Sequence, residues 1–313
     1  AYPSFKATGK KLVLDVCGDG HSFVRDVMKY APDSFDVFAP HPYANPRFLG
    51  PDETAMGPEL GNMKRRLEEY VELYRSDMGD RELWIGELGW GLDARLPFDS
   101  PYAVRHAAYT ARALLIARSF PEVKRYICFR DICCPEGGFY EYGLWRYEDG
   151  VKPNVATAAY ATVAKLLEGA KPLPLISDYD IKIYAYQKDD RVIVAAWDSL
   201  DDDTIEPLEV EVPADEVEVW TMTGTRVPRK SGDGKVTLMT ISPNPSYAIV
   251  KPDAVKPLVE RIQSTIMNRR PVTIESSLPN LKTLSVRTKN KLTVPYAGYL
   301  TASVGQTKVA DKQ

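Results

Sequence analysis

The first 170 residues alternate four short apolar runs with four longer stretches of helical periodicity, and this alternation constrains the fold more than any other feature. Short apolar runs next to Gly or Pro are typical of buried strands. A chain that repeats strand and helix in this way forms parallel strands joined by right-handed crossovers. We therefore expect strands at 11–16, 35–40, 82–87 and 123–130, and helices at 21–30, 59–78, 101–119 and 153–169.

The helical stretches differ in which faces are apolar. Segment 59–78 has apolar residues at helical spacing, which predicts one buried face; these are Leu60, Met63, Leu67, Tyr70, Val71 and Tyr74. Segment 101–119 is Ala-rich and apolar almost all round, as expected for a helix packed between a sheet and its neighbours. Four strand–helix units make half of a (β/α)8 barrel, which needs about 250 residues. A flavodoxin-like open sheet is the alternative topology.

The pattern changes to period-two alternation after residue 175. Segment 181–198 alternates on both sides of a Lys-Asp-Asp turn and predicts a hairpin. Further strand-like runs at 208–212, 217–222, 235–241 and 246–250 predict an antiparallel β-sandwich. Segment 253–270 is expected to be a helical or extended connector, and 271–313 the start of another β module. The predicted units are therefore 1–172, 173–252 and 253–313.

Charge and composition exclude several classes of partner. The 313 residues have a net charge of −3 and no basic run, so we expect no nucleic-acid partner. The sequence contains no stretch of eighteen apolar residues, so we expect no membrane span. The four cysteines contain no Cys-x-x-Cys pair and predict buried or half-buried thiols rather than a metal site; they are Cys17, Cys128, Cys133 and Cys134.

The third strand ends in a carboxylate between glycines. Functional groups of parallel barrels lie at the carboxyl ends of strands, where the loops form the mouth of the pocket. Glu87 stands there between Gly86 and Gly89, which allow close approach of backbone and substrate. Trp90 follows and could offer a flat face to a sugar ring. The alternative for Glu87 is a solvated strand-end residue.

Two other strand ends also carry polar or aromatic groups. His41 and Tyr43 follow the second strand and can reach one pocket, although a hydrogen-bonded structural histidine is equally compatible with the spacing. The fourth strand ends in Phe129, Arg130 and Asp131. The aromatic-rich loop 137–145 that follows includes Tyr142. Interleaved aromatics and charges suit carbohydrate, and a loop that covers the barrel rim is the alternative.

In this order and spacing the three segments resemble clan A of the glycoside hydrolases. DVFAPHPY (36–43) is similar to the sixth barrel strand of that clan, LWIGELGW (83–90) to the seventh, and YICFRD (126–131) to the eighth. The stretch 143–169 is similar to the end of the barrel, and 217–227 and 236–250 look like the β-domain that often follows. The resemblance covers roughly residues 1–250. It implies the C-terminal half of a TIM barrel, strands five to eight, followed by an antiparallel β-sandwich domain.

The resemblance also implies roles for the site residues. Glu87 would be the nucleophile, and His41 and Tyr43 would line the subsite and hold its geometry. Phe129 stands where many relatives carry a Trp under the sugar, so the floor of this subsite departs from the family. The remaining substrate-binding candidates are Trp90, Arg130, Asp131 and Tyr142.

A second carboxylate is expected outside this chain. Retaining glycosidases use a nucleophile and an acid/base about 5 Å apart. In clan A the acid/base follows an Asn at the end of the fourth strand, and this sequence has no Asn-Glu dipeptide. We expect the missing half of the barrel in the same longer polypeptide or in another chain, and this chain alone to be inactive.

The resemblance thus favours a retaining glycosidase that acts on a polysaccharide or oligosaccharide. A non-catalytic carbohydrate-binding relative is the alternative, and a scaffold whose β modules mediate attachment is the third hypothesis. No motif calls for a metal or an organic cofactor. Glycan chemistry suggests an extracellular or cell-surface location.

Overall fold

The computed structural model describes most of the chain up to residue 269 and four strands beyond it. The described residues are 4, 6–18, 20–52, 55–131, 140–147, 150–178, 180–201, 206–230, 234–269, 273–280, 283–289, 300–304 and 307–312.

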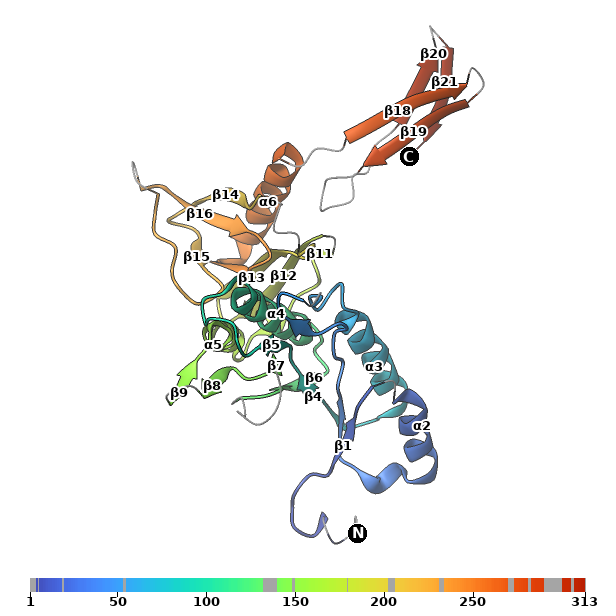
Figure 1. Cartoon of the computed structure of the whole chain (residues 1–313), viewed down its shortest axis with the longest axis vertical. Helices are drawn as coiled ribbons and strands as arrows, with labels where there is room; N and C mark the ends of the chain where they lie inside the picture. The colour runs from blue at the N-terminus through green and yellow to red at the C-terminus, as the bar shows by residue number, and fades with distance from the viewer. Residues whose placement is uncertain are drawn as a thin grey trace.

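A parallel sheet of four strands forms the first half of the molecule (Figure 1). Its strands are β1 (Val13–Val16), β2 (Val37–Pro40), β4 (Glu82–Leu88) and β6 (Val123–Cys128). They lie side by side in chain order, and each adjacent pair is parallel. A flavodoxin-like sheet reverses its strand order at a switch point. The described sheet has no such reversal, so its topology is not that of the alternative.

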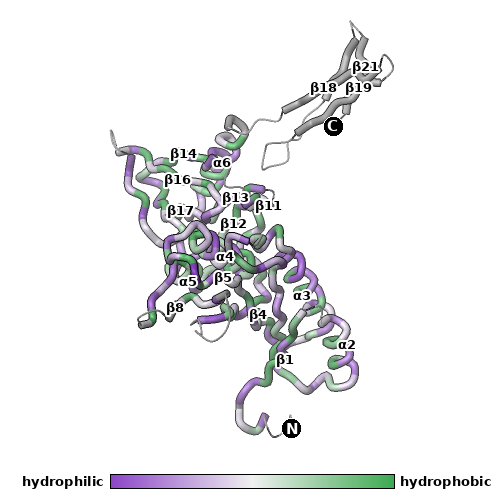
Figure 2. The backbone as a smooth tube through the Cα atoms, in the orientation of Figure 1, coloured by the Kyte–Doolittle hydropathy of each residue, from purple (hydrophilic) through white to green (hydrophobic). Residues whose placement is uncertain are grey.

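Four helices connect and cover these strands. They are α2 (His21–Tyr30), α3 (Met63–Asp77), α4 (Pro101–Arg118) and α5 (Val155–Leu167). Each packs against the next along the chain. Polar and apolar residues alternate along α2 and α3, as expected for helices with one buried face (Figure 2). A short 3-10 helix, η1 (Pro32–Ser34), follows α2.

The helix boundaries follow local capping. Ser100 caps α4 by accepting a hydrogen bond from the backbone N–H of Ala103, and Asn154 caps α5 in the same way. Helix α3 begins later than predicted, at Met63, because the preceding residues form turns and Asn62 has a left-handed backbone. Leu60 therefore lies outside the helix and is exposed, so its assignment to the buried face was wrong.

Short strands follow the carboxyl ends of the main strands. Three of these short strands form a separate sheet, in the order β3 (Phe48–Leu49), β5 (Gly91–Asp93) and β7 (Tyr140–Glu141). Each belongs to the segment after one parallel strand, so the loops at this edge are tied to one another. The hairpin of β8 (Trp145–Tyr147) and β9 (Val151–Pro153) then leads into α5.

The second half is antiparallel. One sheet contains β10 (Lys171–Pro172), β11 (Ser177–Asp178), β12 (Ile181–Lys188), β13 (Arg191–Asp198), β15 (Glu218–Trp220) and β17 (Ser246–Val250). A second pair consists of β14 (Leu208–Pro213) and β16 (Val236–Ile241). The predicted hairpin at 181–198 is confirmed as β12 and β13.

Both faces of the β12–β13–β17 sheet are buried, because alternate residues enter two different cores. One set packs with β14, β16 and helix α6 (Val255–Arg269), which follows the 3-10 turn η2 (Pro252–Ala254). The other set joins the core that contains α4 and α5, and the Tyr186 hydroxyl donates to the carbonyl of Leu115 at 2.6 Å. Helix α6 agrees with the helical alternative predicted for 253–270, and it contributes Leu258 and Ile262 to the second core.

Two strand pairs occupy the described part of 271–313, as the alternation predicts. They are β18 (Thr273–Asn280) with β19 (Thr283–Lys289), and β20 (Leu300–Val304) with β21 (Thr307–Lys312). Among the described residues, no helix combines the length and the apolar character that crossing a membrane requires.

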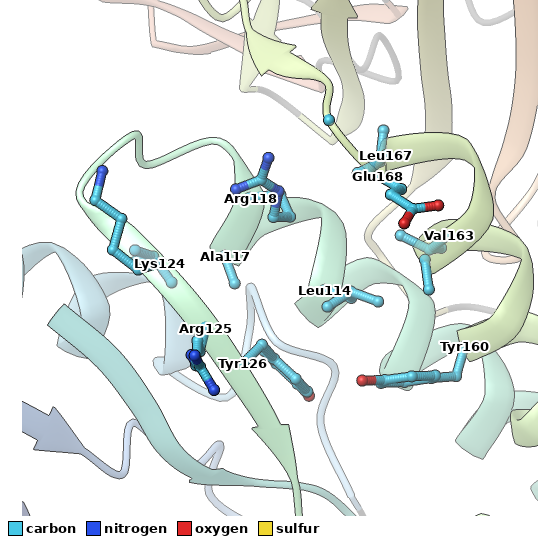
Figure 3. A pocket seen from close by; sticks show the side chains of 13 residues that line it. Leu114, Ala117, Arg118, Lys124, Arg125, Tyr126, Tyr160, Val163, Leu167 and Glu168 are labelled. Carbon is cyan, nitrogen blue, oxygen red and sulfur yellow. The ribbon is translucent and has the colours of Figure 1, made fainter. Parts of the chain in front are cut away.

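A cavity of about 330 Å³ lies between β6, α4 and α5. Tyr126 and Tyr160 point toward each other across it, and Arg118 and Lys124 lie at one side (Figure 3). The Tyr126 hydroxyl is buried and has no hydrogen-bond partner among the described residues. This cavity borders β6, the outermost strand of the parallel sheet.

A buried histidine in α4 makes stability depend on pH. His106 is fully enclosed, and burial lowers its pKa to about 4, with a smaller effect of Arg146 in the same direction. The unfolded chain therefore binds a proton between pH 6.5 and 4 that the folded chain does not bind, and stability falls as pH falls through this window. We expect a loss of about 3 kcal/mol from this group between pH 7 and pH 4.

Urea unfolding at pH 7 and pH 4, followed by fluorescence, measures this effect. The His106→Phe variant should lose much less stability than the unaltered chain over the same pH change. An equal loss in both proteins would show that other groups cause the acid sensitivity.

Candidate active site

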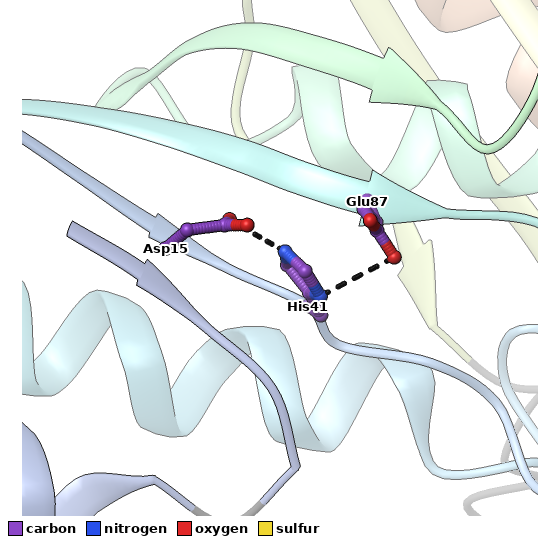
Figure 4. Close-up of side chains that lie close together, drawn as sticks. All are labelled: Asp15, His41 and Glu87. Atoms are coloured by element: carbon purple, nitrogen blue, oxygen red, sulfur yellow. Dashed lines mark hydrogen bonds and ion pairs between the residues drawn. The ribbon is translucent and has the colours of Figure 1, made fainter. Parts of the chain in front are cut away.

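Three polar side chains meet at the carboxyl edge of the parallel sheet (Figure 4). Asp15 is the penultimate residue of β1, His41 directly follows β2, and Glu87 is the penultimate residue of β4. Because parallel neighbours end at the same edge, side chains from three separate segments come together there. The structure thus brings Glu87 and His41 into one site and adds Asp15.

His41 lies between the two carboxylates. Its side chain is 2% exposed, and Nε2 is 2.6 Å from Asp15 Oδ1. Nδ1 is 3.2 Å from Cys17 Sγ and 3.5 Å from Glu87 Oε2. A proton on Nε2 donates to Asp15 and leaves Nδ1 as the acceptor for the thiol. This hydrogen bond to Asp15 fixes the orientation of the imidazole beside Glu87.

The glycines that flank Glu87 are required by close neighbours. A Cβ on Gly86 would lie 2.4 Å from Asp15 Oδ1 and 2.9 Å from His41 Nε2. A Cβ on Gly89 would lie 2.0 Å from the carbonyl oxygen of Phe129. These distances are far below van der Waals contact, so any larger residue would displace the groups that surround Glu87.

Glu87 itself is held and still accessible. Its side chain is 34% exposed, and the hydroxyl of Tyr43 donates to Oε2 at 3.1 Å. Burial raises the pKa of Tyr43 well above its usual range, and the charge of Glu87 raises it further. Tyr43 therefore keeps its proton at neutral pH and serves as a hydrogen-bond donor to the carboxylate.

Aromatic rings form a wall beside this carboxylate. Tyr43 and Phe129 meet edge to face with ring centres 6.4 Å apart, and Phe129 and Tyr142 do so at 5.2 Å. Arg47 is hydrogen-bonded to this wall, because its Nε donates to the Tyr142 hydroxyl at 2.9 Å. Of the candidates for sugar contact, Phe129 and Tyr142 thus share this wall with Tyr43, whose hydroxyl binds Glu87.

The assignment of Trp90 to substrate binding is not supported. Its side chain is completely buried, and its indole N–H donates to the carbonyl of Met56 at 2.9 Å. One ring face packs against Tyr109 in the core beneath α4. Trp90 lies between β4 and β5. Because its side chain is enclosed in the core, neither face of its ring is free to contact a sugar.

Arg130 and Asp131 follow Phe129 just after the end of β6, and their assignment to substrate binding stays a prediction. Arg130 is half-buried, and its guanidinium carbon lies 5.5 Å from the ring centre of Phe129. Asp131 is exposed next to it. Residues 137–139 of the aromatic-rich loop lie outside the described residues, whereas 140–145, which include Tyr142, lie within them.

Three residues of the site were not predicted as site residues, namely Asp15, Cys17 and Arg47. Asp15 could have been found, because it is the charged residue near the end of an apolar strand. Cys17 is exposed, contrary to the expectation of a buried thiol, whereas Cys128 is half-buried as expected. Partial burial and then the charges of Glu87 and Asp15 raise the pKa of the Cys17 thiol, which keeps it protonated.

Asp15, His41 and Glu87 also have the donor types of a metal site. Asp15, His41 and Glu87 offer ligand atoms that all lie within 4.8 Å of one another. The two carboxylates approach different nitrogens of the imidazole, and a metal ion bound through Nδ1 and Glu87 would leave Nε2 free to donate to Asp15. The expectation that the reaction needs no metal therefore stays a prediction.

The fold is that of a known glycoside hydrolase over most of the chain. No family model and no curated protein matches this sequence. The solved family 39 glycoside hydrolase from the gut symbiont Bacteroides cellulosilyticus WH2 is similar in structure, with a TM-score of 0.53 and 23% identity. The similarity covers 74% of this chain and 48% of that one, so this chain spans about half the length of its structural relative.

Other solved glycoside hydrolases match with lower scores. The family 39 enzyme from Xanthomonas axonopodis pv. citri has a TM-score of 0.44 and 15% identity, over 80% of this chain and 62% of that one. A family 30 endoxylanase from Clostridium papyrosolvens C71 has a TM-score of 0.43 and 13% identity, over 72% and 52%.

Proposed function

We propose that this chain carries the nucleophile-bearing half of a retaining glycoside hydrolase, with Glu87 as the nucleophile. The observation that supports this most is the setting of Glu87, an accessible carboxylate at the end of a parallel strand that accepts a hydrogen bond from Tyr43 and lies beside His41. The substrate class would be a polysaccharide or an oligosaccharide.

The reaction would proceed by double displacement. A Glu87 oxygen attacks the anomeric carbon, the bond from that carbon to the leaving oxygen breaks, and an acid outside this chain protonates the leaving oxygen. Water, deprotonated by the same group, then cleaves the glycosyl ester and releases Glu87. The Tyr43 hydroxyl would fix the attacking carboxylate and stabilise it again as the departing group.

Asp15 supplies a second carboxylate close to Glu87, with ligand atoms within 4.8 Å. Retaining enzymes need a nucleophile and an acid/base about 5 Å apart. Asp15 is nevertheless engaged with the buried His41 ring, which would have to lose this partner if Asp15 bound a leaving group. We therefore assign Asp15 to positioning and place the acid/base in the missing half of the barrel.

The missing half would pair with the two outer strands of the parallel sheet. β1 and β6 are its edges, and each leaves a large apolar side chain exposed, Val13 at 39% and Ile127 at 45%. An unpaired edge with exposed apolar residues favours added strands. These would come from the same longer polypeptide or from another chain.

The same proposal fixes the organisation of the chain. Residues 1–172 would be strands five to eight of a TIM barrel, and 173–252 a β-sandwich domain to which α6 also belongs. The remaining residues up to 313 would begin a further β module. A glycan substrate suggests that the protein acts outside the cell or at the cell surface.

The test uses the completed protein, which is this chain together with the missing half of the barrel. Incubated with a panel of polysaccharides and oligosaccharides, it should release sugars whose anomeric configuration is initially the same as in the substrate, as proton NMR of the fresh product shows. Initial inversion of the anomeric configuration would contradict the double-displacement mechanism. Binding of a glycan with no release of sugar would instead support the non-catalytic relative.

A further inference from the structure

Two arginines flank the aromatic wall beside Glu87. The guanidinium carbon of Arg47 lies 4.8 Å from the ring centre of Tyr43, whose hydroxyl binds Glu87. Arg130 lies over Phe129 on the other part of the wall. One aromatic ring therefore separates the Arg47 guanidinium from the Glu87 carboxylate.

Both arginines lack a carboxylate partner among the residues that the structure describes. Arg47 donates through Nε to the Tyr142 hydroxyl, which uses one of the five N–H groups of the guanidinium. By contrast, Arg95, Arg112 and Arg146 each form an ion pair with a carboxylate. A half-buried guanidinium that is held in place by a neutral group and an aromatic ring keeps its charge available for a ligand.

Without these two arginines, the carboxylates of the site would repel an anionic sugar. Glu87 and Asp15 both carry carboxylates at the mouth, and Asp131 adds another exposed one. A negatively charged sugar could approach only if positive groups lay beside its charged substituent. The planar fork of a guanidinium matches carboxylate and sulfate oxygens in a bidentate manner.

We propose that Arg47 and Arg130 bind an anionic substituent of the glycan, either the carboxylate of a uronic acid or a sulfate ester. This rests on the proposed function, because it concerns the substrate of the same site. Arg47 is placed to contact the sugar bonded to Glu87, and Arg130 a neighbouring sugar beyond Phe129.

The test measures binding rather than turnover. The completed protein with Glu87→Gln is applied to an array of neutral, uronic-acid-containing and sulfated oligosaccharides. The best anionic binder is then compared by calorimetry with its carboxyl-reduced or desulfated counterpart, which distinguishes the two sources of charge. We expect the anionic form to bind at least about tenfold more tightly, and the preference to shrink as salt is raised.

Substitutions assign the preference to the two arginines. Arg47→Gln and Arg130→Gln should each reduce the affinity for the anionic form about tenfold more than the affinity for the neutral form. Arg226→Gln removes the same charge from an exposed position in the turn after β15 and should change neither affinity.

Two outcomes overturn the inference in different ways. Equal affinity for the charged and neutral forms, or an equal loss of both in the arginine variants, would refute anion recognition and leave the glycosidase proposal intact. Failure of every glycan to bind would contradict the proposed function and the inference together.

Discussion

Replacing Glu87 by Gln in the completed enzyme should lower kcat by about 10⁴-fold or more, because the amide cannot form the glycosyl ester. The change is nearly isosteric, and the amide oxygen can still accept the hydrogen bond from Tyr43. The fold and the binding of glycan should therefore persist. Initial rates on the substrate found in the glycan panel, together with calorimetric binding of the same glycan, separate the loss of chemistry from a loss of binding.

Glu82→Gln is the matched control for this experiment. Glu82 lies on the same strand at its opposite end, where it pairs with Lys11 at the surface. It should retain nearly full activity, since surface pairs contribute little to stability and this one is remote from the site. If Glu87→Gln kept a rate close to that of the Glu82 variant, Glu87 would not be the nucleophile and the proposed mechanism would be wrong.

Much of the parallel sheet could be predicted from the sequence because its signals are local. Each strand is a short apolar run beside turn residues, and the rule that functional groups gather at strand ends led directly to His41, Tyr43 and Glu87. The same rule applied to the first strand would have found Asp15. Its side chain stands within an otherwise apolar run and ends beside His41.

The errors concern side chains whose surroundings depend on distant segments. Trp90 follows the nucleophile strand and was predicted to face the sugar, but the carbonyl of Met56 and the ring of Tyr109 draw it into the core. Arg47 gave no sequence signal, because its position over Tyr43 depends on a loop and on Tyr142, 95 residues away. Sequence pattern shows which strand end carries a residue, whereas tertiary packing decides which way the residue points.

A buried ion network between the two halves was also invisible in the sequence. Arg112 of α4 is fully buried and pairs with Glu59 and Asp201, which are 53 and 89 residues away. Asp201 also accepts a hydrogen bond from the backbone N–H of Gly57 at 3.0 Å, and Glu59 accepts one from the indole of Trp197 at 2.6 Å. The network thus joins α4, the turn before α3 and the end of β13.

Arg112→Met should destabilise the folded chain by about 3–5 kcal/mol, because it leaves two carboxylates buried without a counter-charge. The Glu59 and Asp201 side chains are 5% and 11% exposed, so water can solvate them only slightly. Urea unfolding at pH 7 measures the change.

Arg65→Met is the matched control, since Arg65 pairs with Glu69 on the exposed face of α3 and its loss should cost less than about 1 kcal/mol. A similar small loss for Arg112→Met would mean that the two carboxylates reach water when the arginine is removed. The β-sheet would then be held on α4 by the apolar contacts around Tyr186 and by the hydrogen bond from Tyr186 to Leu115.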